Sequence, residues 1–480
     1  MNGSETDQNL VQIKGSKTSS VTSSSPTSIV DHLKNEDRNL PGVYIKTYGC
    51  QMNVYDTDKL YGILQNNYTP VFAPEEAELI IVNTCSVREK AEHKLYSLVG
   101  SLKSLKKKNE KLLIGVGGCV AQQEGRSITT RSKDVDFVFG THNLSLVPSL
   151  ISQVKISGTK QVAVDYRDEW EDLPLGVGNT LNHYSRASQF VSISRGCNRN
   201  CTYCVVPQTR GKEVSRPVDE ILREVELAAA RGVKEIVLLG QTVNSYGYDL
   251  TPKIKFAELL SLVSEVDDIK RIRFTSPHPQ EIKKDFYKLI EVNDKVCRHV
   301  HMPLQSGSDT ILKAMNRNYR RKRYLDIITG LKNVCADVSI TTDIIVGFPG
   351  ETESDFQDTL DVIREVQFDS SYSFMFSPRP NTLAADMENQ VEQEVKARRL
   401  QELQALQDQI THERLESWVG KKVEVLVDGF TKRDDSQLKG RNSQNLLVHL
   451  GGETDHLGPG MFTDVIIERA AKYTLHGKVV

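Results

Sequence analysis

Three cysteines on one short loop carry the strongest chemical signal in the chain. Cys197, Cys201 and Cys204 lie within eight residues, in the stretch CNRNCTYC. Thiolates bind zinc and iron–sulfur clusters alike, but structural zinc generally takes four ligands in two separated pairs. The nearest further candidate ligand, His183, lies fourteen residues upstream of Cys197. Three ligands on a cluster of four irons leave one iron open, so the loop predicts a cluster that can bind a second molecule.

Three further cysteines each follow a short apolar run that predicts a buried strand. Cys50, Cys85 and Cys119 are about 35 residues apart, roughly the length of one βα unit. The apolar runs are 43–47, 78–83 and 111–116. In an open parallel sheet the carboxyl ends of the strands meet at one edge, where ligands bind. The spacing therefore predicts a second three-thiolate site, with inert buried cysteines as the alternative.

A second series of strands and helices must position the cysteine loop. Helical segments such as 218–231 and 355–366 separate most of six candidate strands. These strands end at Arg195, Leu239, Phe274, Met302, Val346 and Met375. Six repeats in succession indicate a parallel barrel or most of one, with its chemistry at the carboxyl ends of the strands. Gln241, Gln305 and Glu351 lie at three of those ends, where each could contact a ligand or simply cap a helix or close a turn.

The predicted fold class is α/β, in three parts. An open parallel α/β domain comes first, then a partial (β/α)6 barrel with a long trailing helix over 388–418, then a small antiparallel β-barrel. Strands at 422–427, 445–450 and 462–468 predict the last part. The expected boundaries are a disordered Ser/Thr-rich leader over 1–40, the first domain over 41–155, a linker over 156–185, the central domain over 186–416 and the last domain over 417–480.

The composition of the chain limits which partners it can bind and in which cellular compartment it can lie. The 61 Lys and Arg residues against 63 Asp and Glu residues give a formal net charge of −2, so bulk positive charge cannot hold nucleic acid and a local patch would be needed. No apolar run approaches the ~20 residues that span a bilayer. The start of the chain has no secretory signal pattern. Eight cysteines in such a chain indicate a reducing, cytoplasmic location and metal binding or catalysis in place of disulfides.

The cysteine loop after the first barrel strand resembles that of the radical S-adenosylmethionine (SAM) superfamily. The surrounding motifs are similar to those of the tRNA-modifying branch of the radical SAM methylthiotransferase family. They are TYGCQMN at 47–53, NTCSVREKA at 83–91, GGCVAQ at 117–122, SRGC at 194–197, LGQTVNSYG at 239–247 and HMPLQSGS at 301–308. The resemblance covers about residues 43–480, and the final β-barrel resembles the RNA-binding TRAM domain.

The resemblance implies two 4Fe-4S clusters and a specific reaction. Cys197, Cys201 and Cys204 would hold a cluster whose open iron binds SAM, and Gln241, Gln305 and Glu351 are candidate SAM contacts. A 5′-deoxyadenosyl radical would then take hydrogen from carbon 2 of N6-isopentenyladenosine at position 37 of tRNA. Cys50, Cys85 and Cys119 would hold the second cluster, which presents or donates sulfur, and a second SAM would supply the methyl group. The implied partners are the tRNA anticodon stem-loop, a one-electron reductant protein and a sulfur donor, with no membrane.

Four residues depart from the usual pattern of that family. Asn200 and Gln208 stand where apolar or aromatic residues are usual, and Asn381 and Leu383 replace the usual Gly and Pro. None removes a thiolate, so the departures bear on SAM packing and on the approach of the substrate. Cys297 and Cys335 have no partner at ligand spacing and are interpreted as core residues. We interpret His278 and His301 as structural, with substrate orientation as the alternative.

Other functions fit parts of the sequence. Within the same class, the target could be threonylcarbamoyl-adenosine in tRNA or an aspartate of a ribosomal protein, although the segments 241–247 and 301–308 speak against both. From other classes, the chain could be a non-catalytic iron–sulfur electron carrier, a redox-sensing RNA-binding protein or a zinc-stabilised RNA-binding module.

Overall fold

The computed structural model describes residues 40–86, 90–174, 187–431 and 436–480. Residues 1–39 of the expected leader over 1–40 and residues 175–185 of the expected linker over 156–185 lie outside the described residues. Within the described ranges, no helix combines the length and the apolar character that crossing a bilayer requires.

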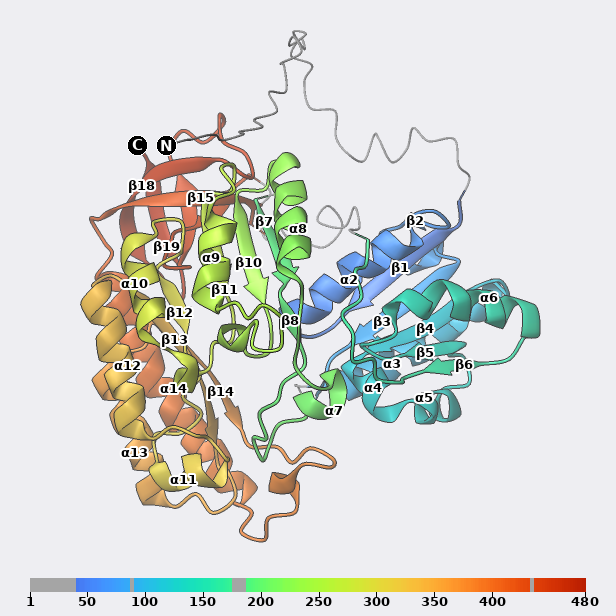
Figure 1. Ribbon diagram of the computed structural model, residues 1–480, viewed down its shortest axis with the longest axis horizontal. Helices are drawn as coiled ribbons and strands as arrows, with labels where there is room; N and C mark the ends of the chain where they lie inside the picture. The colour runs from blue at the N-terminus through green and yellow to red at the C-terminus, as the bar shows by residue number, and fades with distance from the viewer. Residues whose placement is uncertain (1–39, 87–89, 175–186, 432–435) are drawn as a thin grey trace, which may run out of the picture. The chain divides into compact units, whose positions relative to one another are not determined.

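The first domain is an open sheet of six parallel strands, in the order β2-β1-β3-β4-β5-β6 (Figure 1). The strands are β1 (Gly42–Thr47), β2 (Thr69–Pro70), β3 (Leu79–Thr84), β4 (Leu113–Gly118), β5 (Phe137–Phe139) and β6 (Gln161–Ala163). The helices are α2 (Gln51–Leu64), α3 (Lys90–Lys108), α4 (Cys119–Glu124), α5 (Arg126–Arg131) and α6 (Val147–Ser157). Alternate residues of β3 face two separate apolar cores, Leu79 and Ile81 in one and Ile80 and Val82 in the other. Both faces of the sheet are therefore covered, as its continuous apolar strands predicted.

One boundary of this domain differs from the sequence prediction. The linker was expected from residue 156, but α6 continues to Ser157 and β6 then pairs with β5. Strand β6 has only three residues, so it is too short to stand out as a periodic apolar run.

The central domain contains six parallel barrel strands in two three-stranded sheets, β7-β10-β11 and β12-β13-β14. An isolated parallel bridge joins Ile272 to Val296, which lies three residues before the second sheet begins at His299. The strands are β7 (Ser188–Ser192), β10 (Glu235–Leu239), β11 (Arg271–Phe274), β12 (His299–His301), β13 (Ser339–Val346) and β14 (Ser370–Met375). Helices pack outside them: α8 (Val218–Ala230), α9 (Phe256–Ser264), α10 (Lys284–Val292), α11 (Asp309–Ala314), α12 (Arg321–Val334) and α13 (Glu353–Val366). This arrangement confirms the predicted partial barrel.

The first barrel strand is shorter than predicted. Strand β7 ends at Ser192, and the expected end at Arg195 belongs to β8 (Ser194–Arg195), which pairs antiparallel with β9 (Val214–Ser215). The chain leaves the barrel there because β8 and β9 close the base of the loop that carries the cysteines and the short helix α7 (Val206–Arg210).

The trailing helix and the last domain follow. Helix α14 (Gln393–Glu416) buries Leu403 and Ile410 in the main core, so it belongs to the barrel. The last domain is a closed barrel in the order β15-β16-β17-β19-β18. Its strands are β15 (Lys422–Phe430), β16 (Leu438–Arg441), β17 (Leu447–Gly451), β18 (Phe462–Ala470) and β19 (Leu475–Val479). It is not wholly antiparallel as expected, because β17 and β19 pair in parallel.

Candidate functional site

The cysteine loop is anchored on both sides by backbone hydrogen bonds. The Thr202 N–H donates to the Met315 carbonyl oxygen at 3.2 Å, and the Thr202 carbonyl accepts from the Ala384 N–H at 2.8 Å. Two of the sulfurs also accept backbone N–H groups of their own loop. Cys197 Sγ accepts from Arg199 at 3.3 Å, and Cys204 Sγ accepts from Val206 at 3.5 Å. Polar N–H groups aimed at sulfur stabilise negative charge there, as thiolate ligands require.

A buried arginine lies against this triad. Arg317 is 7% exposed, its Nη1 lies 3.5 Å from Cys201 Sγ, and its Nε donates to the Tyr319 hydroxyl at 3.1 Å. Among the described residues no carboxylate pairs with Arg317, although buried charges in proteins are normally paired. Burial raises the pKa of the Cys204 thiol to about 12 and also raises that of Cys197, so these two thiols are neutral unless further positive charge is added. A metal cluster would supply that charge, and bound metal deprotonates coordinating thiols.

The other three cysteines meet at the carboxyl edge of the first sheet. Cys50 precedes α2, Cys85 follows β3, and Cys119 begins α4. Gly49 shows how closely they pack, because a Cβ added there would lie 2.2 Å from Cys85 Cβ. Its φ of +119° is one that residues with a side chain rarely adopt. The edge predicted from the strand spacing does collect the three side chains.

Charge is distributed differently around this second triad. A hydrogen bond with Cys85 is the largest influence on Cys50 and, with the nearby positive charge of Arg210, lowers the pKa of Cys50 to about 6. Burial raises the pKa of Cys119, and Arg210 opposes that rise. Arg210 itself is 5% exposed and pairs with Asp56 Oδ2 at 2.7 Å. The site therefore already contains a cation that favours thiolates.

Helix α7 joins the two triads. It begins two residues after Cys204 and ends at Arg210, whose Nη2 also donates to Asn53 Oδ1 at 3.1 Å on α2. A helix of five residues is about 7.5 Å long. The last thiol of the loop triad thus precedes one end of α7, and the cation of the second triad occupies the other end.

In the part of the chain that the structure describes, no three His, Cys, Asp or Glu side chains are grouped closely enough to hold one metal ion. A structural zinc ion needs its ligands around one point. In a cubane cluster each thiolate binds a different iron atom, so the ligand sulfurs stand farther apart.

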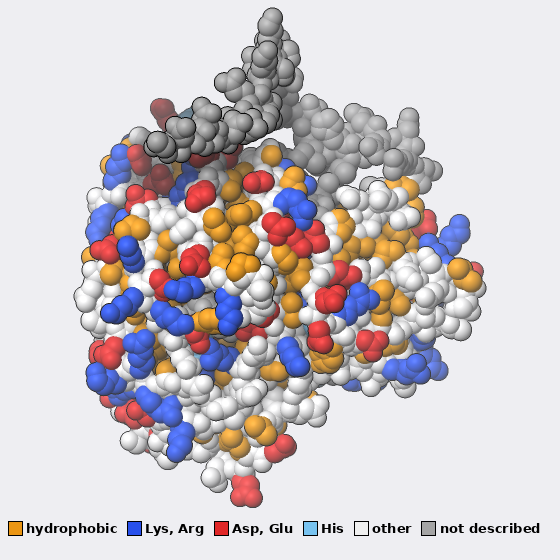
Figure 2. Space-filling view, in the orientation of Figure 1, with side chains coloured by type: hydrophobic (Ala, Val, Ile, Leu, Met, Phe, Trp, Pro, Cys, Tyr) orange, Lys and Arg blue, Asp and Glu red, His pale blue; other side chains and the backbone are white. Residues whose placement is uncertain are grey.

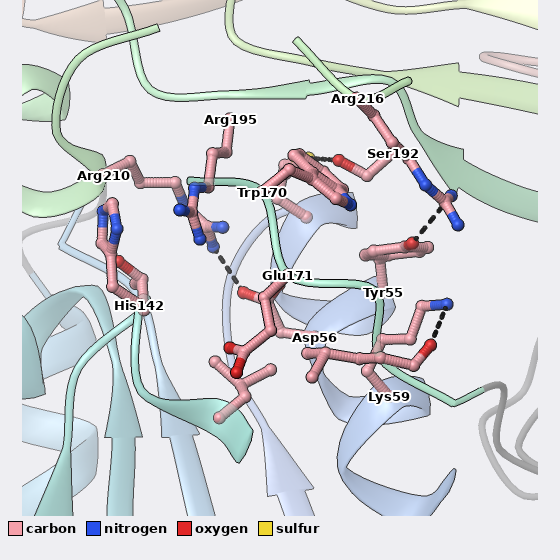
Figure 3. A pocket seen from close by; sticks show the side chains of 14 residues that line it. Tyr55, Asp56, Lys59, His142, Trp170, Glu171, Ser192, Arg195, Arg210 and Arg216 are labelled. Carbon is pink, nitrogen blue, oxygen red and sulfur yellow. Dashed lines mark hydrogen bonds and ion pairs between the residues drawn. The ribbon is translucent and has the colours of Figure 1, made fainter. Parts of the chain in front are cut away.

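A small cavity lies between α2 and the segment that leads into the loop. Its volume is about 50 Å³, and its lining includes Tyr55, Asp56, Trp170, Arg195 and Arg210 (Figure 3). The Arg195 guanidinium lies 5.8 Å from the Trp170 ring centroid. Such a volume admits a few water molecules but no nucleoside.

The three candidate SAM contacts have different surroundings. Gln241 Oε1 is buried without a partner, beside Thr242, whose hydroxyl lies 3.6 Å from Cys197 Sγ. Gln305 has a φ of +70°, and its backbone pairs with β13. Glu351 accepts from the Gly347 N–H at 2.6 Å and pairs with Arg399 at 2.8 Å. Gln241 thus offers a buried acceptor without a partner, whereas turn closure accounts for Glu351.

The four departures from the family pattern are partly connected. The Gln208 side-chain amide donates to the Asn381 carbonyl, so two of the unusual residues contact each other. Asn381 has a φ of +60°, which explains the usual glycine and the tolerance for asparagine. The Asn200 carbonyl accepts from Asn316 Nδ2 at 2.8 Å, and Leu383 is 69% exposed.

The remaining sequence candidates divide between core and surface. Cys297 and Cys335 are buried, as interpreted from the sequence. His278 is 6% exposed and its Nδ1 accepts from the Gln280 N–H, and burial lowers its pKa to about 2. His301 is only partly buried and lies 3.2 Å from Asp343 Oδ2. Arg210 and Arg317 were not predicted, because each lies far along the chain from the cysteines it contacts.

The partial barrel and its three-cysteine loop define a radical SAM protein. The Radical SAM superfamily pattern matches residues 191–363, the uncharacterized protein family UPF0004 matches 42–140, and the TRAM domain matches 416–480. A tRNA-2-methylthio-N(6)-dimethylallyladenosine synthase of Alkaliphilus oremlandii is 45% identical over 94% of this chain and 96% of its own. One of Syntrophus aciditrophicus is 42% identical over 91% and 94%. The chain therefore belongs to the tRNA-2-methylthio-N(6)-dimethylallyladenosine synthase family.

Solved structures support the fold alone. The radical SAM methyltransferase TsrM from Kitasatospora setae, with cobalamin and a 4Fe-4S cluster bound, superposes with a TM-score of 0.53 at 13% identity. The match covers 72% of this chain and 74% of TsrM. The cobalamin-dependent radical SAM enzyme OxsB gives a TM-score of 0.51, over 79% of this chain and 57% of its own.

Proposed function

We propose that this chain adds a 2-methylthio group to N6-isopentenyladenosine at position 37 of tRNA. The observation that carries the proposal is the pair of thiol triads joined by α7. Relatives that are named for this reaction are 42–45% identical over more than 90% of the chain. Two adjacent thiolate sites suit a reaction that must activate one carbon and bring sulfur to it.

Family membership implies a 4Fe-4S cluster and SAM, and we assign them to Cys197, Cys201 and Cys204. When bound, the two supply a carbon radical able to take hydrogen from an aromatic carbon that no side-chain base could deprotonate. Arg317 lies against this triad as a buried positive charge, and Gln241 offers an unpartnered acceptor beside it. The residues present therefore fit a charged cluster with a polar ligand.

The second cluster is assigned to Cys50, Cys85 and Cys119. Arg210 contributes the positive charge at this triad, and its pairing with Asp56 fixes the guanidinium. Met52 and Tyr55 of α2 pack against Val237 and Leu239 of β10 and so exclude water from that part of the barrel. A sulfur donor and a one-electron reductant protein complete the proposed reaction, which we place in the cytoplasm.

The last domain is proposed to bind the tRNA, and buried arginines fix its position. Arg273 of β11 donates to the carbonyl oxygens of Asn442 and Ser443 at 2.6 and 2.8 Å and pairs with Glu235 at 2.8 Å. Arg271 likewise donates to the Arg441 carbonyl at 2.7 Å. RNA held by the last domain would thus have a fixed position relative to the barrel.

On the face shown in Figure 2, basic and acidic side chains are interspersed, in line with the near-zero net charge.

The decisive test is mass spectrometry of tRNA nucleosides from cells with and without this protein. We expect the 2-methylthio group to disappear while the isopentenyl group remains. An unchanged 2-methylthio signal would contradict the proposal, and loss of the methylthio group from threonylcarbamoyl-adenosine would support the alternative tRNA target. Metal analysis of anaerobically purified protein separates the other classes, since zinc without visible iron–sulfur absorption would favour a zinc-stabilised RNA-binding module.

A further inference from the structure

The two halves of the barrel differ in what covers their concave faces. In the first half, Val237 and Leu239 of β10 pack against Met52 and Tyr55 of α2. In the second half, alternate residues of β13 divide between two environments. Ile344 and Val346 join the core under the outer helices, whereas Thr341, Asp343 and Ile345 on the opposite face remain partly exposed.

Strand β14 extends this uncovered face with two aromatic side chains. Tyr372 is paired with Asp343, and Phe374 is paired with Ile345, so all four side chains lie on one side of the sheet. Tyr372 is 59% exposed and Phe374 is 44% exposed. Neighbouring large aromatics on the concave side of a barrel are unusual unless a ligand covers them.

Polar groups on the same face are arranged beside the aromatic pair. His301 Nε2 lies 3.2 Å from Asp343 Oδ2, and the His301 ring packs edge-on against Tyr372 with centroids 6.1 Å apart. Among the described residues, Asp343 Oδ1 has no hydrogen-bond partner. A free carboxylate oxygen therefore lies next to a partly exposed aromatic surface.

The face is continuous with the cysteine loop. Ile345 packs against the apolar cluster that contains Phe348 and Phe376. Tyr203, which lies between Cys201 and Cys204, packs edge-on against Phe348 with ring centroids 6.4 Å apart. Ile345 thus links the exposed face that carries Tyr372 and Phe374 to the buried apolar cluster beneath the loop triad.

We propose that Tyr372, Phe374 and Asp343 form the subsite that selects an adenine carrying a branched hydrocarbon on N6. This inference rests on the proposed function and deepens it. Such a base presents one N–H donor and an apolar group from the same nitrogen, matching the Asp343 oxygen and the aromatic side chains. Stacking of bases on aromatic residues of a sheet is a common mode of RNA recognition.

The test compares the binding of two fluorescent anticodon stem-loops, identical except for the dimethylallyl group at position 37. Anaerobically reconstituted enzyme is titrated with each RNA, and the ratio of the two Kd values is the readout. The unaltered enzyme should prefer the prenylated RNA. Tyr372→Ala and Phe374→Ala should each weaken binding of that RNA about tenfold and bring the ratio close to one. Asp343→Asn should give a smaller loss of the same preference.

Two controls match the variants. Ser373→Ala alters the same strand on its opposite face, and Phe72→Ala removes an aromatic that is 66% exposed, more than either tested side chain, from the first domain. Both should keep the ratio unchanged. Tyr372→Leu, which preserves an apolar side chain, should retain part of the preference, and thermal unfolding confirms that each variant is folded.

Failure of the inference and failure of the proposed function would give different experimental results. An unaltered enzyme that shows no preference for the prenylated RNA would overturn the inference, whereas failure of the proposed function would appear as an unchanged 2-methylthio signal in the nucleoside analysis. An intact preference in Tyr372→Ala and Phe374→Ala would overturn only the inference. A change of oligomeric state in those variants, with RNA binding unchanged, would assign the aromatic pair to a protein partner and overturn it as well.

Discussion

Each of the two sites contains three cysteine thiols, but the chain brings the three together in a different way in each. Cys197, Cys201 and Cys204 come from one loop, so chain connectivity alone keeps them together. Cys50 and Cys85 follow separate strands of a sheet, with Cys119 after a third, so they meet only when the sheet has its native register. The loop triad is a property of a short sequence, and the sheet-edge triad is a property of the fold.

Their electrostatic settings differ as well. The loop triad has Arg317 beside one sulfur, and burial raises the pKa values of Cys197 and Cys204. At the sheet edge, Cys50 has a pKa lowered to about 6, chiefly through its hydrogen bond with Cys85. At the sheet edge, Cys50 favours the anionic form before any metal binds, although burial raises the pKa of Cys119. In the loop, burial disfavours the anionic form of Cys197 and Cys204, so these two thiols depend on the charge of a metal.

The largest expected effect is on the loop triad. Cys197→Ala should abolish reductive SAM cleavage, because a cluster with two remaining ligands in the loop cannot hold SAM at an open iron. The measurement is 5′-deoxyadenosine formation under anaerobic reduction, together with iron content. Iron should fall to about half that of the unaltered enzyme, since the other triad is untouched. Full SAM cleavage by this variant would contradict the assignment of the loop.

Loss of a sheet-edge cysteine should separate SAM cleavage from methylthiolation of tRNA. Cys85→Ala is expected to leave some SAM cleavage but to stop methylthiolation of tRNA, because only the second cluster is lost. The products to quantify are 5′-deoxyadenosine and 2-methylthio-N6-isopentenyladenosine. If Cys85→Ala still methylthiolates at the normal rate, the second-cluster assignment is wrong.

The same contrast, between features set by a short stretch of sequence and features set by the fold, explains what the sequence could predict. Strands β10, β11, β13 and β14 end at the predicted residues because their apolar runs stop at polar or glycine-containing motifs. The three-residue strand β6 and the parallel pairing of β17 with β19 were missed, since a short run has no clear period and pairing direction is a tertiary property.

The cysteines of both triads could be predicted, but their charged neighbours could not. Arg317 lies 116 residues from Cys201, whose sulfur it contacts. Arg210 lies 154 residues from Asp56, with which it pairs. Contacts across such separations depend on tertiary packing, which spacing along the chain does not encode.

A glycine substitution can break the sheet-edge triad without removing a thiol. Gly49→Ala would bring a Cβ within 2.2 Å of Cys85 Cβ at a φ of +119°, so we expect a loss of about 3 kcal/mol of stability from strain and overpacking. Iron content should fall toward half while SAM cleavage persists. The matched control is Gly158→Ala, whose φ is +65° in open space and which should cost about 1 kcal/mol with normal iron content. Equal iron in both variants would show that the sheet-edge triad tolerates displacement.

The smallest expected effect is a dependence of stability on pH near the loop triad. Burial, with the nearby charges of Arg317 and Arg199, lowers the pKa of His278 to about 2, whereas the unfolded chain has an ordinary histidine pKa of about 6.5. Below pH 6.5 the unfolded state therefore binds a proton that the folded state does not, and stability falls by up to about 1.4 kcal/mol per pH unit. His278→Asn keeps an acceptor for the Gln280 N–H and removes the titration, so the variant should lose less stability than the unaltered protein between pH 7 and pH 5. Urea denaturation at both pH values measures the difference, and parallel losses in the two proteins would show that His278 is protonated in the folded state.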